Sequence, residues 1–309
     1  MQIKDFPVYL TMREKGATAP VGDYVEAPND VYTATYHEGE TLAEDTMEKP
    51  CLRFGTPHCD EQAAGPFPVS GEPVVALITK NRGHGQGWMF SLDREGDPPT
   101  ELHLQYSREA RLAPGGNAVV LSDRRQLESF DVKSGNVDTL CKLPPNQVVR
   151  DLAINRDGSR VLVALRDEED DGGAADELDW FDRATGELQT IQLEDEPAVE
   201  QMALSPDGHT LAALNEGRLQ MIDLSTGKSR ALEISDGPGY VRGVAFTPDG
   251  TRLLCDRIDP GTDGCYTHSR LYAVSPQGGP PRLLLSNDDL LSAYPTAAEQ
   301  SMQHPQCGN

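Results

Sequence analysis

The sequence lacks long apolar runs and is poor in large aromatic side chains. Its 309 residues include 7 Phe and 2 Trp, against 29 Gly and 23 Pro. A membrane-spanning helix needs about 18 or more consecutive apolar residues, and no such run occurs, so none is predicted. Few aromatic residues together with abundant Gly and Pro favour a loop-rich, all-β protein over a helical bundle.

Several catalytic and metal-binding motifs are also missing. The sequence contains no GxSxG, no HExxH and no CxxC, and its 7 histidines show no metal-ligand spacing. These absences argue against an α/β-hydrolase, a zincin, and a zinc ribbon or thioredoxin. We therefore expect no catalytic residue, no metal ligand and no cofactor.

Basic residues are scarce, and the excess of acidic residues is not evenly distributed along the sequence. The net charge is −23, from 50 acidic and 27 basic residues. Such a surface repels phosphate, which argues against nucleic-acid and anionic-membrane partners. Residues 166–200 contain 14 acids and 2 bases. This local excess favours electrostatic steering towards a protein with a basic surface.

The six cysteines indicate in which cellular compartment the protein resides, because disulfides persist mainly in an oxidising one. The pairs Cys51–Cys59 and Cys255–Cys265 each enclose a turn-forming segment. A disulfide across such a loop stabilises by roughly 2–3 kcal/mol in the chain-entropy description. The first residues lack the apolar core of a signal peptide. We expect a periplasmic or secreted protein whose signal has been removed. The alternative is a cytoplasmic protein with free thiols.

A short phrase recurs four times: an apolar strand, a tight turn and a second apolar strand. The turns end in PGG, RDG, PDG and PDG, at glycines spaced 42, 50 and 42 residues apart. Pro presets φ, Asp caps the turn, and Gly adopts the positive φ. "SPDG" therefore indicates a hairpin turn rather than a binding site. The four turns end at Gly116, Gly158, Gly208 and Gly250.

A second turn phrase, as in "MIDLSTGKSRAL", alternates with the first. Each unit of 39 to 51 residues then contains two hairpin turns and about four strands. Four-stranded units at this period are typical of β-propeller blades. The sequence predicts an all-β fold with a single propeller. The second set of turns ends at Gly96, Gly135, Gly186, Gly227 and Gly278.

The stretches "LSPDGHTLAAL", "FTPDGTRLLC" and "LYAVSPQGGPPRLL" resemble the TolB-type and WD-repeat-like propeller repeats, and "MIDLSTGK" resembles the YVTN-type repeats. The resemblance covers roughly residues 66–286. It implies the fold but not a function, because these blades serve many tasks. TolB-like proteins also carry an N-terminal α/β domain, for which the first 65 residues are too short.

One propeller domain over residues 1–309 is expected, with about six blades and seven as the alternative. The irregular segments 1–65 and 287–309 are expected to complete and close the ring. The recognisable blades in residues 66–286 span about 68–108, 109–148, 149–197, 198–238 and 239–286.

Three stretches depart from the repeat, and the first is "KNRGHGQGW" at residues 80–88. It carries two adjacent cations in an acidic protein. Its glycines lack the strand-to-helix context of a phosphate-binding loop. The stretch is either a long turn or a binding loop, in which Arg82, His84 and Trp88 are the candidate contacts.

The second stretch, "RDEEDDGGAADELDW", is an acidic insertion between two strands. Read as a calcium loop from Asp167, its twelfth position is Leu178 rather than Glu, so an EF-hand is rejected. A solvated loop, a weak calcium site or a contact with a basic partner are the alternatives. The candidate partner-binding residues are Asp167, Glu168, Glu169, Asp170 and Asp171.

The third stretch, "DRIDPGTDGCYTH" at residues 256–268, is expected to be a loop closed by Cys255 and Cys265, with a metal site as the alternative. Its candidate partner-binding residues are Asp259, Asp263 and His268.

Together these observations predict a non-enzymatic propeller that captures a protein partner through loops on one face. An accessory subunit, an inhibitor and an immunity protein are equally compatible with the sequence. The alternative function is a metal-dependent hydrolase or lactonase with its site in the central channel. Apolar strands such as "VVALIT" and "TLAAL" argue against that alternative.

Overall fold

The computed structural model describes part of the chain, and its regular elements there are all β-strands. No helix in this described part has the length and hydropathy to cross a membrane. Side chains are described for most of the same positions from 111 to 285. The described residues are 5–14, 30–37, 63–68, 74–81, 84–91, 100–102, 109–113, 118–123, 125–131, 134–169, 174–195, 198–234, 239–260, 266–287, 290–292 and 296–297.

Five sheets have four strands each, in which consecutive strands are antiparallel neighbours. Sheet 1 contains β3 (Ala63–Pro68), β4 (Val74–Asn81), β5 (His84–Ser91) and β6 (Thr100–Leu102). Sheet 2 contains β7 (Glu109–Leu112), β8 (Ala118–Asp123), β9 (Gln126–Asp131) and β10 (Val137–Lys142). Sheet 3 contains β11 (Gln147–Ile154), β12 (Arg160–Asp167), β13 (Glu177–Asp182) and β14 (Glu187–Thr190). Sheet 4 contains β15 (Gln201–Leu204), β16 (Thr210–Asn215), β17 (Arg218–Asp223) and β18 (Ser229–Leu232). Sheet 5 contains β19 (Tyr240–Phe246), β20 (Leu253–Pro260), β21 (Tyr266–Val274) and β22 (Arg282–Asn287).

A sixth sheet joins the two ends of the chain. One edge of β1 pairs with β2, and its other edge pairs with β23 and β24. The described residues thus form six sheets, one of which contains strands from both terminal segments. The blade limits outside the described residues stay predictions. The four strands are β1 (Asp5–Glu14), β2 (Asp30–His37), β23 (Leu290–Ser292) and β24 (Thr296–Ala297).

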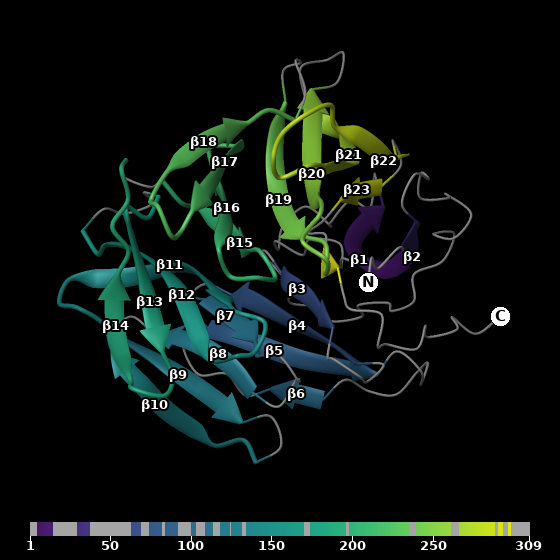
Figure 1. Cartoon of the computed structure of the whole chain (residues 1–309). Helices are drawn as coiled ribbons and strands as arrows, with labels where there is room; N and C mark the ends of the chain where they lie inside the picture. Colours follow the sequence, from purple (N-terminus) through teal and green to yellow (C-terminus); the bar gives the residue numbers. More distant parts are fainter. Residues whose placement is uncertain are drawn as a thin grey trace.

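The inner strands of neighbouring sheets contact one another around a common centre. The contacts run from β3 to β7, β11, β15 and β19, then to β24 and back to β3. Figure 1 shows the sheets arranged around this centre, with the first strand of sheets 1–5 nearest to it. The ring of antiparallel sheets has the architecture of a β-propeller.

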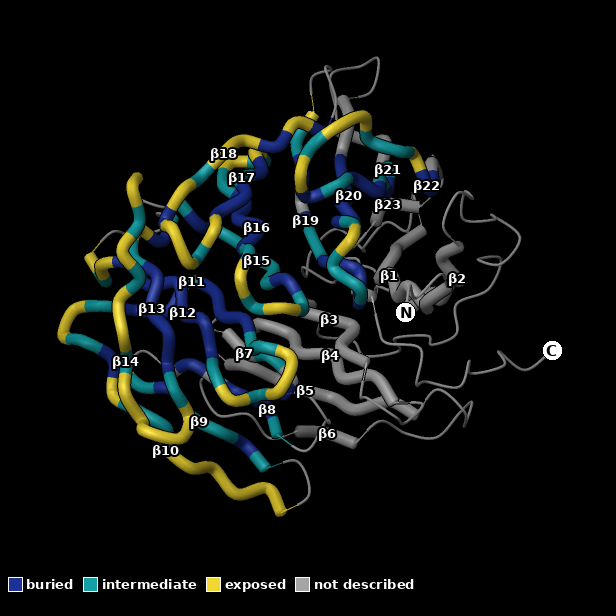
Figure 2. The backbone as a smooth tube through the Cα atoms, in the orientation of Figure 1, coloured by how far each residue is buried: buried dark blue, intermediate teal, exposed yellow. Residues whose placement is uncertain are grey.

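The second strand of a sheet has a continuous run of apolar residues because it is buried on both faces. Six consecutive residues of β12, from Val161 to Arg166, are buried, because neighbouring sheets cover both of its faces. The outer strands β10 and β14 are largely exposed, and Figure 2 shows this contrast. The core therefore lies between the sheets and not inside any one of them.

The recurring turns that the structure describes form as the sequence predicts, whereas those at Gly96 and Gly116 lie outside the described residues. In sheet 4 the Ser205 hydroxyl donates to Asp207 at 2.6 Å, and Gly208 has a φ of 75°. The matching turn of sheet 5 has the same bond from Thr247 to Asp249 at 2.6 Å. These carboxylates accept bonds from within their own turns, so "SPDG" stabilises a hairpin.

The cysteine prediction is wrong for Cys255. This residue is a free, fully buried thiol on β20, where it pairs with Tyr272 of β21. The far end of the same hairpin pairs Pro260 with Tyr266, which directly follows Cys265. Because a strand rises about 3.3 Å per residue, the five residues from Cys255 to Pro260 span far more than a disulfide allows. The pair Cys51–Cys59 lies outside the described residues.

Candidate functional site

The sheets have two different ends. Because their strands are antiparallel and follow in order, the turn between the second and third strands lies opposite the other two turns. Neighbouring sheets share this orientation, since Pro206 of a first turn lies against Gly250 of the next first turn. We call the end with these first turns the turn face, and the opposite end the insertion face. The three unusual stretches each contain the connection between a second and a third strand, so their described residues run towards the insertion face.

The first stretch is mostly strand. β4 continues to Asn81 and β5 starts at His84, so only residues 82–83 separate the two strands. Trp88 pairs with Leu77 in the body of the hairpin, which corrects the expectation of a loop over residues 80–88. Arg82 lies outside the described residues.

The third stretch is also mostly a hairpin. Asp259 of β20 and His268 of β21 are direct cross-strand partners, although the sequence predicted a loop there. The strands continue to Pro260 and from Tyr266, so this hairpin extends further than the one between β16 and β17. Asp263 lies outside the described residues.

The acidic insertion begins and ends at fixed points. At its start, the Glu168 amide donates to the Asn146 carbonyl at 2.7 Å, and the Glu169 amide donates to Asp167 at 2.9 Å. At its end, Ala175 forms a β-bridge with Val199. Asp170 and Asp171 lie outside the described residues.

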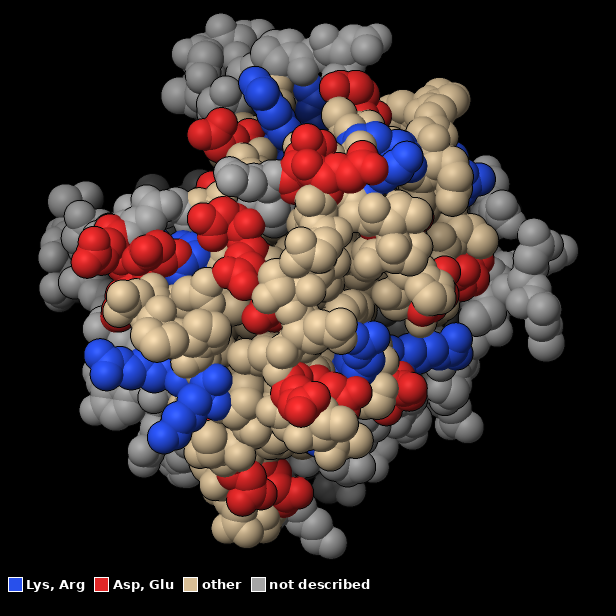
Figure 3. Space-filling view, turned by 60° about the vertical axis from the view of Figure 1, so that its left-hand side comes forward, with Lys and Arg blue, Asp and Glu red and all other residues tan. Residues whose placement is uncertain are grey.

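Exposed acids dominate the insertion face of sheets 3 and 4. One exposed base, Arg218, is present among the described residues of their second-to-third-strand turns. Figure 3 shows several groups of acidic side chains on one side of the molecule, with basic side chains between them. The exposed acids of these turns are Asp167, Glu169, Asp176 and Glu216.

The turn of sheet 4 is tightly packed. Glu216 and Gly217 both have positive φ, at 47° and 71°, as a two-residue hairpin turn requires. The Glu216 amide donates to the Glu200 carboxylate at 3.1 Å, and the Val241 amide donates to the Gly217 carbonyl at 3.0 Å. A Cβ at Gly217 would lie 2.2 Å from the Cβ of Tyr240. These contacts tie the insertion face of sheet 4 to sheet 5.

A polar cluster that the sequence did not reveal lies beside the insertion. Gln147 donates to Glu177 at 2.6 Å, and Thr190 donates to the other Glu177 oxygen at 3.1 Å. The nearby Asp179 is 2% exposed, and burial raises its pKa, with the charge of Glu177 adding to the effect. Burial also raises the pKa of the Cys141 thiol, to which the charge of Asp179 contributes. Three strands of sheet 3 supply this cluster, so no local motif could have predicted it.

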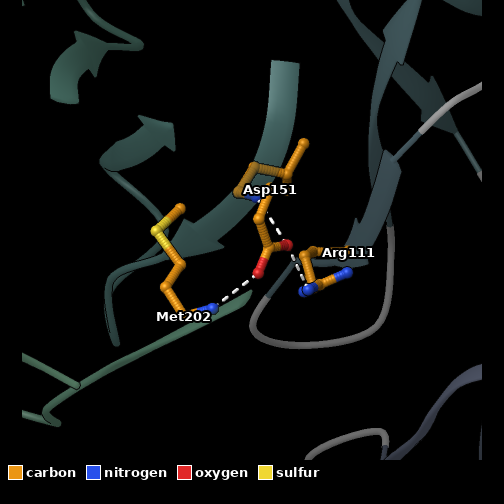
Figure 4. A network of polar contacts seen from close by, with 4 residues as sticks. Arg111, Asp151 and Met202 are labelled. Carbon is orange, nitrogen blue, oxygen red and sulfur yellow. Dashed lines mark hydrogen bonds and ion pairs between the residues drawn. The ribbon is translucent and has the colours of Figure 1, made fainter. Parts of the chain in front are cut away.

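A buried aspartate joins the inner strands of three sheets. Asp151 on β11 is 2% exposed, forms an ion pair with Arg111 on β7, and accepts the Met202 amide of β15 at 2.7 Å. Figure 4 shows its two oxygens pointing to these separate partners. Asp151 thus fixes sheets 2, 3 and 4 relative to one another.

Comparisons with solved structures give the same architecture. TolB from Acinetobacter baumannii matches with a TM-score of 0.63 and 14% identity, over 95% of this chain and 66% of that one. A chain of the nidogen–laminin complex matches with a TM-score of 0.61 and 13% identity, over 94% and 98%. The chain has a TolB-like β-propeller fold.

An oligogalacturonate lyase in complex with manganese matches the propeller with a TM-score of 0.53 and 17% identity, over 70% of this chain and 62% of that one. The chain thus spans less than two thirds of the length of the lyase and just under two thirds of TolB. No family model and no curated protein matches the sequence. Within the described residues, no group of three His, Cys, Asp or Glu side chains is placed to hold a metal ion.

Proposed function

We propose that this propeller is a non-enzymatic binding protein that captures a protein with a basic surface through its insertion face. The observation that carries the proposal is the shared position of the three unusual stretches, which are far apart in the sequence but occupy one end of the sheets. Loops on a rigid scaffold often carry binding function.

Charge indicates the kind of partner. The described turns of sheets 3 and 4 expose four acids and one base at this face. Complementary charge accelerates association and selects partners, and added salt screens it over about 10 Å at 0.1 M. A basic partner should therefore bind faster at low salt and be released by a salt step.

The fold neighbours support a binding role only as analogy. One of them is a chain of the nidogen–laminin complex, so a protein of this fold takes part in a protein complex. The TolB likeness supports a periplasmic location for this chain in the same indirect way. Fold alone does not assign function.

The experiment is affinity capture from an extract of the native source, followed by a salt step. The test variant E169Q/D176N removes two exposed acids from the insertion face. The control D138N/E187Q removes two exposed acids next to turns of the turn face. We expect one stoichiometric partner that is released by salt, lost with E169Q/D176N and retained with the control.

Equal capture by both variants would refute the role of the insertion face. If no partner is captured and the purified protein hydrolyses a lactone in a metal-dependent manner, the enzyme alternative replaces the proposal. Recovery of the partner by a second pull-down at physiological salt would separate specific capture from non-specific charge attraction.

A further inference from the structure

Arg166 is a buried base at the insertion-face end of β12. Its side chain is 9% exposed, and its Nη1 atom is buried without a hydrogen-bond partner among the described residues. Arginine stays charged in proteins. Because a buried charge without a counter-charge is costly, this position points to an anionic ligand.

A second arginine lies close to the first. The β11–β12 ladder pairs Val148 with Arg166, then shifts at a bulge between Val149 and Asp151 that makes Arg150 the extra residue. Arg150 thus lies two residues along β11 from Val148, the cross-strand partner of Arg166, so the two arginines are on adjacent strands close to the same end. The Nε atom of Arg150 is also buried without a partner. Two arginines with buried nitrogen atoms that lack a hydrogen-bond partner therefore lie on neighbouring strands.

Sheet 5 repeats this bulge. The β19–β20 ladder shifts between Val241 and Gly243, so Arg242 is the extra residue there. Bulges redirect side chains and are common beside active sites. The repeat thus places an arginine at the same point of two inner strands.

Four of the nearby described carboxylates are held by other groups, whereas the exposed Asp176, which directly precedes the Leu165 partner Glu177, lies beside Arg166 in the ladder. Asp151 accepts from Arg111 and from two backbone amides, and Glu177 accepts from Gln147 and Thr190. Glu200 accepts the Glu216 amide, and Asp167 accepts the Glu169 amide. None of these four acids forms an ion pair with Arg150 or Arg166 in the described part of the chain.

We propose that Arg150 and Arg166 form a binding site for the oxyanion group of a small molecule, a carboxylate or a phosphate. Guanidinium groups bind both through paired N–H donors. The site is independent of the proposed protein-binding function, because the basic partner would contact the exposed acids and not these two arginines.

The first experiment measures thermal unfolding while inorganic phosphate or succinate replaces chloride at constant ionic strength. We expect a saturable rise in Tm, because a ligand that binds the folded state stabilises it. The dissociation constant should rise at least tenfold in R150Q and R166M, and stay unchanged in R218M, which removes an exposed arginine of the same face. A response to phosphate alone or to succinate alone identifies the group. No saturable response to either overturns the proposal.

The second experiment asks whether the chain's own insertion already neutralises the site. In chloride alone, R166M should raise the Tm because it removes a buried charge, and D170N/D171N should leave the Tm unchanged. If both variants lower the Tm, the acids of the insertion are the counter-charge and the proposal fails. E169Q/D176N should retain a saturable phosphate response, and R166M should leave partner capture unchanged. These readouts distinguish failure of this site from failure of the proposed function.

Discussion

The turn face and the insertion face use the same amino-acid types for opposite purposes. At the turn face, Asp207 and Asp249 accept hydrogen bonds from their own turns. At the insertion face, Asp176 and Glu169 are exposed acids. The repeat therefore specifies hydrogen bonds within the turns of the turn face. It does not specify the length or composition of the connections at the insertion face.

The comparison also separates two kinds of glycine. Gly208 at the turn face needs its positive φ but has no atom within 4 Å of a built Cβ. Gly217 at the insertion face needs both the positive φ and the missing side chain, because Tyr240 of the next sheet lies against it. The Gly217 position therefore takes part in packing between sheets as well as in chain reversal, which the Gly208 position does not.

The largest expected effect comes from Gly217→Ala. The new Cβ would lie 2.2 Å from the Cβ of Tyr240, at a φ of 71°. Strain and overpacking together should lower the free energy of unfolding by about 3 kcal/mol. Gly208→Ala also places alanine at a positive φ, but its Cβ would meet no other atom. It should therefore lower the free energy of unfolding by only about 1 kcal/mol. Equal losses in chemical denaturation would show that Tyr240 moves freely and would remove the distinction between the two glycines.

Asp151→Ala tests the link between inner strands, which belongs to neither face. Removal of the carboxylate leaves Arg111 and the Met202 amide without this partner. We expect a loss of about 2–3 kcal/mol in urea unfolding. Asp138→Ala on exposed β10 should change stability by less than about 0.5 kcal/mol. A similar small change at Asp151 would show that the sheets pack without this link.

Two aspartates should give opposite pH dependences. The Ser205 hydroxyl holds the pKa of Asp207 below its usual value. The stability from Asp207 is therefore present above its unfolded pKa of about 3.9 and is lost as the pH falls through the folded pKa. Asp207→Asn should cost on the order of 1 kcal/mol at pH 7 and flatten this acid loss.

Burial instead raises the pKa of Asp179. Its contribution is present below about pH 3.9 and is lost as the pH rises through the folded pKa. Asp179→Asn should remove this loss, which urea midpoints measured from pH 3 to 7 would detect. Parallel pH profiles for Asp207→Asn and Asp179→Asn would contradict both assignments.

The smallest expected effect is stabilising. Glu216 has a φ of 47°, which asparagine tolerates better than glutamate. Glu216→Asn should raise the free energy of unfolding by about 0.5 kcal/mol, because its amide can still donate to Glu200. Guanidinium unfolding measures this change. A loss of stability would show that the Glu216 side chain has a contact that favours this strained turn.

Much of the fold could be predicted from the sequence, because propeller blades repeat short-range signals. The turns ending at Gly158, Gly208 and Gly250 have the positive φ that their residues predict. The apolar runs of β12 and β16 are buried as expected. The prediction of a Cys255 disulfide was wrong because the number of residues between two cysteines does not show how far the strands extend. Here β20 and β21 continue through the stretch that was expected to be a loop.

The sequence by itself determined the repeating four-stranded units, their turns and the acidic excess, since each depends on residues that are close along the chain. Only the tertiary structure decided that the three unusual stretches lie at one face, that Asp151 links three sheets, and that Arg150 and Arg166 are neighbours. These features depend on strand register and on packing between sheets. Both join residues that are distant along the chain, and no local pattern records such pairings.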